Sequence, residues 1–523
     1  MLWAVASEPA ERSGPNPLEI EHDDRAVVAR DSVLTLSGSV YAAVMGFVLT
    51  AVVGRLFGSE VSGYFFEGVA LFMILNGISL LGSDTGMVRS VAAFRAVHDP
   101  ARVRDTFAVT VGPVLAWSCL VAGGLVLATP ALAGRLAPHD ETVARTYLVV
   151  LALSLIPGVV GHACLCATRS MGSLRPYVGF YQVFLPTTRV LGVVLVAALD
   201  VPVRWLMLCY AVPLVLMDLW VFVFCWRRVH AEMTEPVPLT RERFRRAFGK
   251  EWSFNLPRGV AFTFDVALVW IDVLIVGILL GPGPAGAYAV ASRFMTSGTM
   301  ALEALRLGTS PMIAAAFARQ EPARVQSIYA LSSVWLVLLS WPVFLGFAAF
   351  APFVLSLMGT DFLQAATAMT VMSLGMLAHL SMGNINSVLL MAGRSVQTMR
   401  ISGTSLAVNI ALNLLLVPHF GLVGASIAWA SALALDSLLC LRWAQRHLDI
   451  SLPYRGSALA AAITLVAWGL PAAAVRVWGA QNIVWALGFA VVGLAAYVLL
   501  LRHWRAPLGL HGLGEMLRAR VAQ

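Results

Sequence analysis

Charged residues are scarce in this chain of 523 residues, since only 12% are charged whereas 59% are hydrophobic. A soluble domain typically has about a quarter of its residues charged. The apolar residues gather into runs of about 20, the length at which a helix crosses about 30 Å of hydrocarbon. The composition therefore excludes an ordinary soluble fold and indicates a polytopic membrane protein.

The alternating pattern of a membrane β-barrel is absent. Such a barrel needs strands of about ten residues in which apolar and polar positions alternate. Inside lipid every backbone amide must be paired within its own segment, so continuous apolar runs form helices. We predict an all-α fold with about 14 transmembrane helices. The expected spans are 33–56, 64–83, 108–129, 146–168, 177–199, 205–226, 256–278, 287–309, 327–349, 365–391, 398–417, 421–442, 457–477 and 482–502.

Cysteine is also scarce. Its six residues all fall within the predicted spans, and the Cys164–Cys166 spacing is not that of a zinc site. They are therefore interpreted as small core residues, and we predict neither a metal site nor a cofactor. The first 30 residues are polar, which predicts a flexible cytosolic tail and not a cleavable signal peptide.

No outer loop is large enough to carry a catalytic domain. The longest predicted one, 130–145, has only Asp140 and Glu141 as acids. A membrane glycan polymerase, ligase or glycosyltransferase needs a sizeable external loop with catalytic acids, and phosphate-cradling glycine loops and nucleophile motifs are missing as well. These absences argue against an enzyme. A non-transporting membrane scaffold would have the same sequence features and is kept as an alternative.

Arginine and lysine are distributed unevenly along the chain. If the N-terminus is cytosolic, most of the 36 basic residues fall in inner segments, above all in 227–255. By the positive-inside rule both termini then lie in the cytosol, and the net charge of +8 reflects orientation, not nucleic-acid binding. The arginines of 227–255 either form a short amphipathic helix on anionic lipid or simply fix the topology.

Two parts of the sequence repeat each other. The series Gly54, Gly58, Gly63 recurs at one constant offset as Gly277, Gly281, Gly286, and both copies begin on helices of the same direction. A parallel duplication predicts two like six-helix lobes that rock about a central path, as in transporters. The predicted domains are a tail (1–30), an N-lobe (31–226), a basic cytosolic loop (227–255), a C-lobe (256–445), two added helices (457–502) and a cytosolic tail (503–523).

Several short motifs resemble a known family when they are taken in order. They are Gly54–Gly58, Gly63–Phe65, Gly82–Arg89, Ser253–Pro257, Ile271–Asp272, Gly286–Arg293, Asn409–Asn413 and Pro418–Ala425. Together they resemble the polysaccharide flippases of the multidrug/oligosaccharidyl-lipid/polysaccharide exporter superfamily. The resemblance covers the first twelve predicted helices well and the last two weakly.

The resemblance implies a V-shaped pair of lobes that opens alternately to either face of a bacterial cytoplasmic (inner) membrane. The implied substrate is an oligosaccharide on polyprenyl pyrophosphate, moved to the outer leaflet for cell-surface polysaccharide biosynthesis. Membrane lipids, a glycan polymerase and glycosyltransferases are the implied partners, and the coupling ion, H⁺ or Na⁺, is left open.

Two other branches of the superfamily compete with this assignment. Lipid II flippases also have fourteen helices, so family membership alone does not separate them. Multidrug exporters usually stop at twelve helices and carry an acid in the first one. No acid lies between Asp31 and Glu60 here, which disfavours that branch.

Charged residues recur every seven positions in the predicted span 256–278, as Arg258, Asp265 and Asp272. Seven residues make almost two turns, so the three lie along one stripe about 21 Å long. An ionisable group in mid-bilayer costs roughly 2.5–3.5 kcal/mol and must therefore face protein or water. We predict that this stripe and Arg293 line the substrate pathway. The alternative is a set of fixed ion pairs, such as Asp272 with Arg293.

Arg189 is the deepest of the predicted intramembrane arginines. A guanidinium fork grips phosphate oxygens bidentately, so we predict that Arg189 contacts the pyrophosphate. Its alternative partner is Asp218, at a similar depth in the next helix. Glu303 and Arg306, three residues apart on one helix, are likewise placed to pair.

The remaining candidates are polar residues along the pathway and at its ends. Asn409 and Asn413 lie one helical turn apart and suit sugar hydroxyls, although hydrogen bonds between helices are an equal alternative. Arg55, at the outer end of the first helix, and Arg89, at the inner end of the second, are predicted gate contacts or interfacial anchors.

Overall fold

The computed structural model describes residues 17–96, 99–136, 140–170, 176–231, 240–479 and 481–504. These residues are almost entirely helical and contain no strand, which confirms the all-α class. Eleven of the helices are long and apolar enough to cross a membrane. Of the predicted tails, residues 1–16 and 505–523 lie outside the described ranges, whereas 17–30 begin the first helix.

The elements follow one another in this order: α1 (Pro17–Leu80), α2 (Ser83–Ala96), α3 (Pro100–Leu136), α4 (Glu141–Ser170), η1 (Tyr177–Phe184), α5 (Leu185–Ala198), η2 (Val203–Trp205), α6 (Leu206–Ala231), α7 (Arg241–Leu280), α8 (Pro282–Gly298), α9 (Met300–Ala318), α10 (Pro322–Ser356), η3 (Thr360–Ala365), α11 (Ala366–Ser381), α12 (Ile385–Met391), α13 (Ser395–His447), α14 (Tyr454–Thr464), η4 (Leu465–Gly469), α15 (Leu470–Trp478) and α16 (Ile483–His503).

Two of these helices are too long for a single crossing. With 64 and 53 residues, α1 and α13 would measure roughly 95 and 80 Å if straight. Each bends at a glycine with positive φ, Gly58 (φ 75°) and Gly421 (φ 55°), a conformation that side chains with a Cβ avoid. Helices α1 and α13 therefore have two arms each. Helices α8 and α9, which are separated only at Thr299, add a further helical stretch. The total of fourteen crossings stays a prediction.

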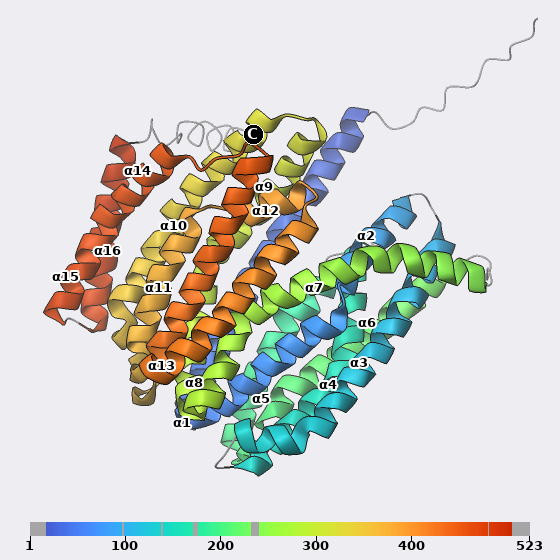
Figure 1. Ribbon diagram of the computed structural model, residues 1–523, viewed down its shortest axis with the longest axis horizontal. Coiled ribbons are helices and arrows are strands. Elements are labelled where there is room, and N and C mark those ends of the chain that lie inside the picture. The colour runs from blue at the N-terminus through green and yellow to red at the C-terminus, as the bar shows by residue number, and fades with distance from the viewer. Residues whose placement is uncertain are drawn as a thin grey trace, which may run out of the picture.

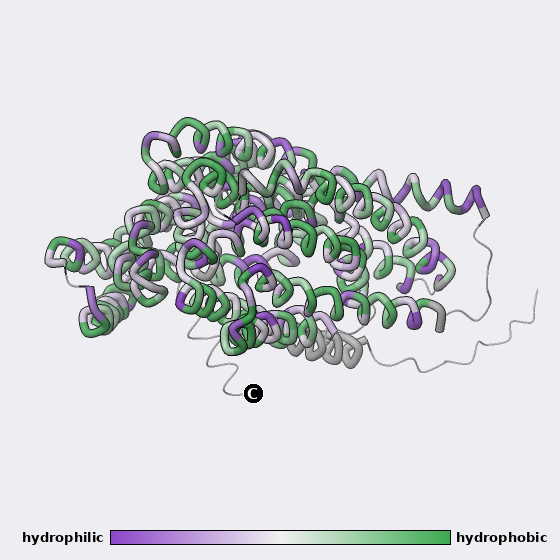
Figure 2. Tube along the Cα trace, turned by 90° about the horizontal axis from the view of Figure 1, so that it is seen from below, coloured by the Kyte–Doolittle hydropathy of each residue, from purple (hydrophilic) through white to green (hydrophobic). Residues whose placement is uncertain are grey.

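The helices form two bundles that diverge like the arms of a V (Figure 1). One bundle contains α2 to α6, and the other contains α8 to α13, with α14, α15 and α16 on its outer side. The added helices are fixed to α10 by contacts such as the Tyr497 hydroxyl, which donates to the Leu338 carbonyl at 2.7 Å. Hydrophobic residues cover most of the trace, as a lipid-facing surface requires (Figure 2).

The repeated glycines lie where the two bundles meet. Gly58 (φ 75°, ψ −177°) and Gly281 (φ 91°, ψ 175°) have nearly the same backbone conformation, so the sequence repeat is also a structural repeat. A Cβ on Gly63 would overlap the Pro282 carbonyl, and one on Gly286 would overlap the Ser59 carbonyl. We call this junction the narrow end of the molecule, and the opposite end, where α2 and the first turns of α7 lie, the wide end.

One helix, α7, belongs to both bundles. Near its start, Arg243 Nη2 lies 2.6 Å from Asp105 Oδ2 on α3, and the Trp252 ring nitrogen donates to the Val109 carbonyl at 3.0 Å. Its C-terminal half packs along α13. Of the two alternatives for 227–255, the structure has a helix there, since residues from Arg241 onward form a single 40-residue helix, while its contact with anionic lipid stays a prediction. Thr240 starts this helix by accepting from the Arg243 amide.

Candidate functional site

A cavity of about 310 Å³ lies between the N-lobe and α7. Residues from α1, α4, α5, α6 and the neighbouring η1 turn form most of its wall. Phe262, Val266 and Trp270, spaced one turn apart on α7, close the remaining side. Its polar lining residues are Asn76, His162, Tyr181, Arg189 and Tyr210.

Arg189 lines this cavity. Its guanidinium carbon lies 3.5 Å from the centre of the Tyr210 ring. Asp218 is close enough to interact electrostatically, yet among the described residues the two form no ion pair. Both carboxylate oxygens of Asp218 and the Arg189 Nε lack hydrogen-bond partners. Stacking on a ring face leaves the edge N–H groups of a guanidinium available to bind oxygens.

Arg293 has a similar setting on α8 of the other lobe. Its guanidinium carbon lies 3.8 Å from the centre of Trp270, the ring that closes the cavity, and its buried Nε has no partner. It interacts electrostatically with Tyr210, against which Arg189 stacks. Two arginines from opposite lobes thus approach one pair of aromatic rings. The predicted alternative of an Asp272–Arg293 ion pair is not formed in the described structure.

Asp272 lies instead in a polar cluster inside the C-lobe. It is 1% exposed, and Asn413 Nδ2 donates to its Oδ1 at 2.6 Å. Asn409 and Asn413 are fully buried. The second Asp272 oxygen, the amide oxygens of both asparagines and the Tyr288 hydroxyl have no partner within the described ranges. Carboxylate and amide oxygens are ligands for hard cations, so this cluster is suited to a small cation or a proton.

The predicted stripe on α7 falls in different environments. Arg258 is half-buried, with its guanidinium 5.9 Å from the Phe262 ring centre. Asp265 is exposed and interacts electrostatically with Arg258 and with Asp436 of α13. Neither Asp265 nor Asp272 lines the 310 Å³ cavity, whose α7 wall is the adjacent face of the helix.

The two predicted gate residues lie at opposite ends of the molecule. Arg55 Nε donates to the Leu357 carbonyl at the end of α10, so it joins the two lobes at the narrow end. Arg89 lies on α2 at the wide end, with its guanidinium 4.4 Å from the Phe254 ring of α7. The predicted Glu303–Arg306 pair is present at 2.9 Å, on an exposed surface.

Glu67 was not anticipated. Its side chain is 2% exposed, and neither carboxylate oxygen has a hydrogen-bond partner in the described part of the chain. It lies one turn after Gly63, against Gly277 of the opposite lobe, where an added Cβ would overlap the carboxyl group. The sequence offers one signal for it, namely an acid spaced four residues from a repeated glycine.

The intramembrane histidines have different neighbours. His162 lines the cavity and stands edge-on to Tyr181, with ring centres 5.4 Å apart. His379 is hydrogen-bonded through Nδ1 to the Ser437 hydroxyl at 2.7 Å. The second arrangement fastens α11 to α13 and is structural.

Comparisons with known proteins agree with this architecture. Residues 257–415 match the MatE family model, a range that includes Asp272, Arg293, Asn409 and Asn413. The probable low-salt glycan biosynthesis flippase Agl15 of Haloferax volcanii is 25% identical over 193 residues, which are 35% of this chain. The chain matches 39% of that relative's length.

Solved transporters share the fold. The lipid II flippase MurJ in an inward closed conformation superposes with a TM-score of 0.68 at 14% identity, over 91% of this chain and 99% of that one. An inward-facing multidrug resistance MATE transporter of the MOP superfamily gives 0.56 at 12% identity, over 80% and 94%. A MOP superfamily transporter from Pyrococcus furiosus, whose binding pocket has reversed polarity, gives 0.55 at 14% identity, over 81% and 95%.

These relatives are transporters and not enzymes. At such low identities the structural likeness establishes the fold, and the MatE match adds family-level support in the C-lobe. Together these findings support a multi-pass membrane transporter with the architecture of the MOP superfamily.

Proposed function

We propose that the protein is a flippase for a polyprenyl-pyrophosphate-linked oligosaccharide, which it moves from the cytosolic to the outer leaflet for cell-surface polysaccharide biosynthesis. The observation that carries the proposal is the convergence of Arg189 and Arg293, one from each lobe, on Tyr210 and Trp270, with no carboxylate ion pair to either arginine among the residues that the structure describes. Two guanidinium forks suit the oxygens of a pyrophosphate. The similarity to a probable glycan flippase supports the same substrate class.

Alternating access follows from the position of these arginines. An anion held between groups of opposite lobes favours the arrangement that brings the lobes together, so binding at one face promotes closure there. We propose fourteen crossings with both termini in the cytosol, which puts the basic wide end on the cytosolic side of a bacterial inner membrane. The molecule in Figure 1 is then open toward the cytosol.

The other predicted pathway residues take separate roles in this proposal. Asp265 and Arg258, nearer the wide end of α7, line the approach for substrate. Asp272 with Asn409 and Asn413 binds the coupling ion, H⁺ or Na⁺, because the cluster contains unpartnered oxygens but does not reach the cavity. Arg55 and Arg89 act at the two gates, and glycosyltransferases and a glycan polymerase act before and after transport.

The proposal is tested by Arg189→Gln and Arg293→Gln, singly and together, in a strain that lacks the gene. We expect each single variant to reach the membrane and restore less than a tenth of the surface glycan, while the lipid-linked oligosaccharide accumulates in the inner leaflet. Arg145→Gln is the matched control, because Arg145 is exposed and paired with Glu141 at 2.8 Å. Full restoration by the double variant would refute the arginine assignment.

A lipid II flippase is the second candidate, favoured by the MurJ superposition over 99% of that chain. The same deletion strain separates the two, because lipid II would accumulate in place of the oligosaccharide precursor. A multidrug exporter is less well supported, since cationic drugs would be repelled by two arginines without ion pairs. If the protein is instead a non-transporting scaffold, neither precursor should accumulate in the deletion strain.

A further inference from the structure

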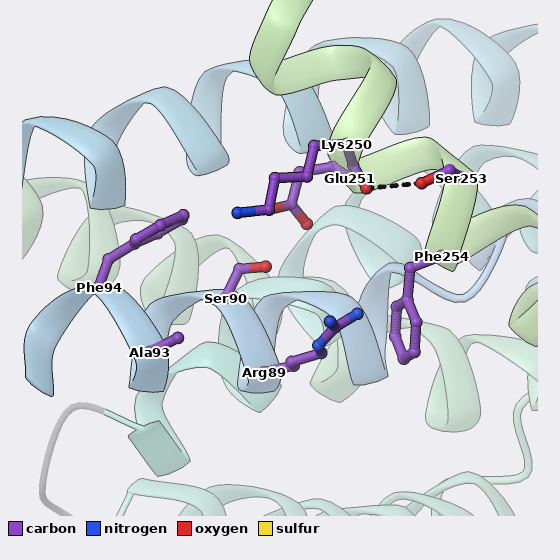
Figure 3. A pocket seen from close by; sticks show the side chains of 8 residues that line it. All are labelled: Arg89, Ser90, Ala93, Phe94, Lys250, Glu251, Ser253 and Phe254. Atoms are coloured by element: carbon purple, nitrogen blue, oxygen red, sulfur yellow. Dashed lines mark hydrogen bonds between the residues drawn. The ribbon is translucent and has the colours of Figure 1, made fainter. Parts of the chain in front are cut away.

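A second pocket, of about 390 Å³, lies at the wide end between α2 and the first turns of α7 (Figure 3). It is separate from the cavity that contains Arg189. Arg89, Ser90 and Phe94 come from α2, and Lys250 and Phe254 come from α7. Transport as proposed above uses the central cavity and gives this pocket no ligand.

The two cations of the pocket are arranged crosswise. Arg89 of α2 lies 4.4 Å from the ring centre of Phe254 on α7, and Lys250 of α7 lies 5.6 Å from the ring centre of Phe94 on α2. Each cation thus contacts an aromatic ring of the other helix. Over the part of the chain that the structure describes, neither forms an ion pair within 4.0 Å.

The neighbouring arginines differ in this respect. Arg102 is paired with Asp99 at 3.1 Å, and Arg243 is paired with Asp105 at 2.6 Å. Their charges are already matched by carboxylates. Within the described residues Arg89 and Lys250 have no such carboxylate pair and, like the exposed Arg241 and Arg245 outside this pocket, retain the capacity to bind an anion.

One acid belongs to the pocket and sets its charge balance. Glu251 is 5% exposed and interacts with the Ser90 hydroxyl and with the charges of Arg89 and Lys250. Two cations and one carboxylate leave a net charge of about +1, which matches one phosphodiester better than a doubly charged phosphate monoester. The single O–H of Ser90 serves the Glu251 carboxylate, so Arg89 and Lys250 would supply the donors to the phosphodiester.

The remaining wall of the pocket is apolar. Phe94, Phe254 and Ala93 give it a surface that suits a glycerol backbone or the start of an acyl chain. One wall of the pocket is the charged start of α7, a helix long and apolar enough to cross a membrane, and charged ends of such helices are where lipid headgroups are expected. We propose that it binds the phosphodiester headgroup of a monoanionic membrane phospholipid.

Such a lipid would hold the wide end in its present arrangement. It would bridge α2 and α7, while the far half of α7 packs on α13 of the C-lobe. Lipid composition would therefore bias the lobes toward the arrangement seen here. The binding step itself does not depend on which substrate is transported, and only the choice of leaflet depends on the proposed orientation.

The test uses the purified full-length protein in detergent, with binding measured by native mass spectrometry and by thermal unfolding. The probes are dioctanoyl phosphatidylglycerol, dioctanoyl phosphatidylcholine and inorganic phosphate. We expect saturable binding and a raised Tm with phosphatidylglycerol alone. A dissociation constant at least tenfold weaker is expected for Arg89→Gln/Lys250→Gln, but not for Arg400→Gln/Arg446→Gln, which removes two exposed charges elsewhere.

The inference is overturned if the first double variant binds like the wild type. It is equally overturned if phosphatidylcholine binds as well as phosphatidylglycerol, or if inorganic phosphate alone gives the full effect. Glu251→Gln provides a second route should the double variant fold poorly. Because it removes the competing carboxylate, it should tighten binding severalfold, and unchanged or weaker binding would also contradict the inference.

Discussion

The two ends of the V are held together by different chemistry. At the narrow end, backbone contacts backbone through Gly63 and Gly286, with no space for a Cβ. Toward the wide end, Gly82 and Gly259 also bring the start of α2 against the backbone of α7, but the outer turns of α2 and α3 meet α7 through side chains, mainly arginine on phenylalanine and arginine on aspartate. Glycine contacts are short and intolerant of substitution, whereas long side chains can rearrange as helices move. This difference indicates that the narrow end fixes the geometry, whereas the outer turns of the wide end, beyond the Gly82–Gly259 contact, permit motion.

The largest expected effect comes from filling the narrow end. Gly286→Ala should lower the free energy of unfolding by about 3 kcal/mol, the upper end of overpacking costs, because the new Cβ overlaps the Ser59 carbonyl. Thermal unfolding in detergent measures it. Gly123→Ala on α3 is the matched control, since nothing lies within 4 Å of its added Cβ. Equal stability of the two variants would remove the distinction between the ends.

Asp272→Asn should have the next largest effect, on transport and not on folding. The amide retains an oxygen for the Asn413 donor but removes the charge that a coupling ion would neutralise. We expect flipping driven by an imposed H⁺ or Na⁺ gradient to fall at least tenfold in proteoliposomes, while the Tm changes little. Wild-type protein without a gradient is the reference. Retention of gradient-driven transport would exclude the Asp272 cluster as the coupling site.

Arg55→Gln should have a moderate effect at the narrow end. It removes a charged donor to the Leu357 carbonyl, a hydrogen bond that is worth about 1.5–3 kcal/mol when a charged group takes part. Because Arg55 and this hydrogen bond are exposed to solvent, the expected loss lies at or below the lower figure. Thermal unfolding should show it, and Arg55→Lys should recover part of the stability. A stability identical to wild type would show that the glycine contacts alone hold this end.

Arg243→Gln should have the smallest effect. Its ion pair with Asp105 is partly exposed, with Arg243 at 33%, and Arg104 also contacts Asp105 at 3.2 Å. Exposed and shared pairs contribute about 0–1 kcal/mol, so the Tm should fall only slightly. A loss as large as that of Gly286→Ala would mean that the wide end is as rigid as the narrow end.

The sequence predicted the overall plan because repeats and apolar runs are encoded locally. The paired glycines indicated two like halves, and their backbone conformations agree. The run of apolar residues also predicted that a transmembrane span begins near residue 256. The helix offered as one alternative within 227–255 was not expected to join that span, whereas α7 runs unbroken from Arg241, since a charged amphipathic turn is helical without being apolar.

The site was predicted less completely. Position along a helix can be counted, so Arg189 was expected deep within its predicted span, and it lines the cavity. The direction in which a side chain faces around the helix axis cannot be predicted in the same way, because consecutive residues are turned by 100° about that axis. Asp272 was thus matched with Arg293 by depth, yet it turns toward Asn413. Glu67 and the aromatic partners Tyr210 and Trp270 depend on packing between helices that no local pattern specifies.

Helix α7 packs against both lobes, and this restricts how the protein can work. Two rigid lobes cannot move relative to each other while one continuous helix is anchored in both of them. Every transport cycle must therefore bend α7, slide it along a lobe or detach it from one. Pro257 lies within it and lacks the amide that an unbroken helix would use, which makes this the natural point of bending. A chemical staple placed across Pro257 should therefore arrest turnover without touching substrate.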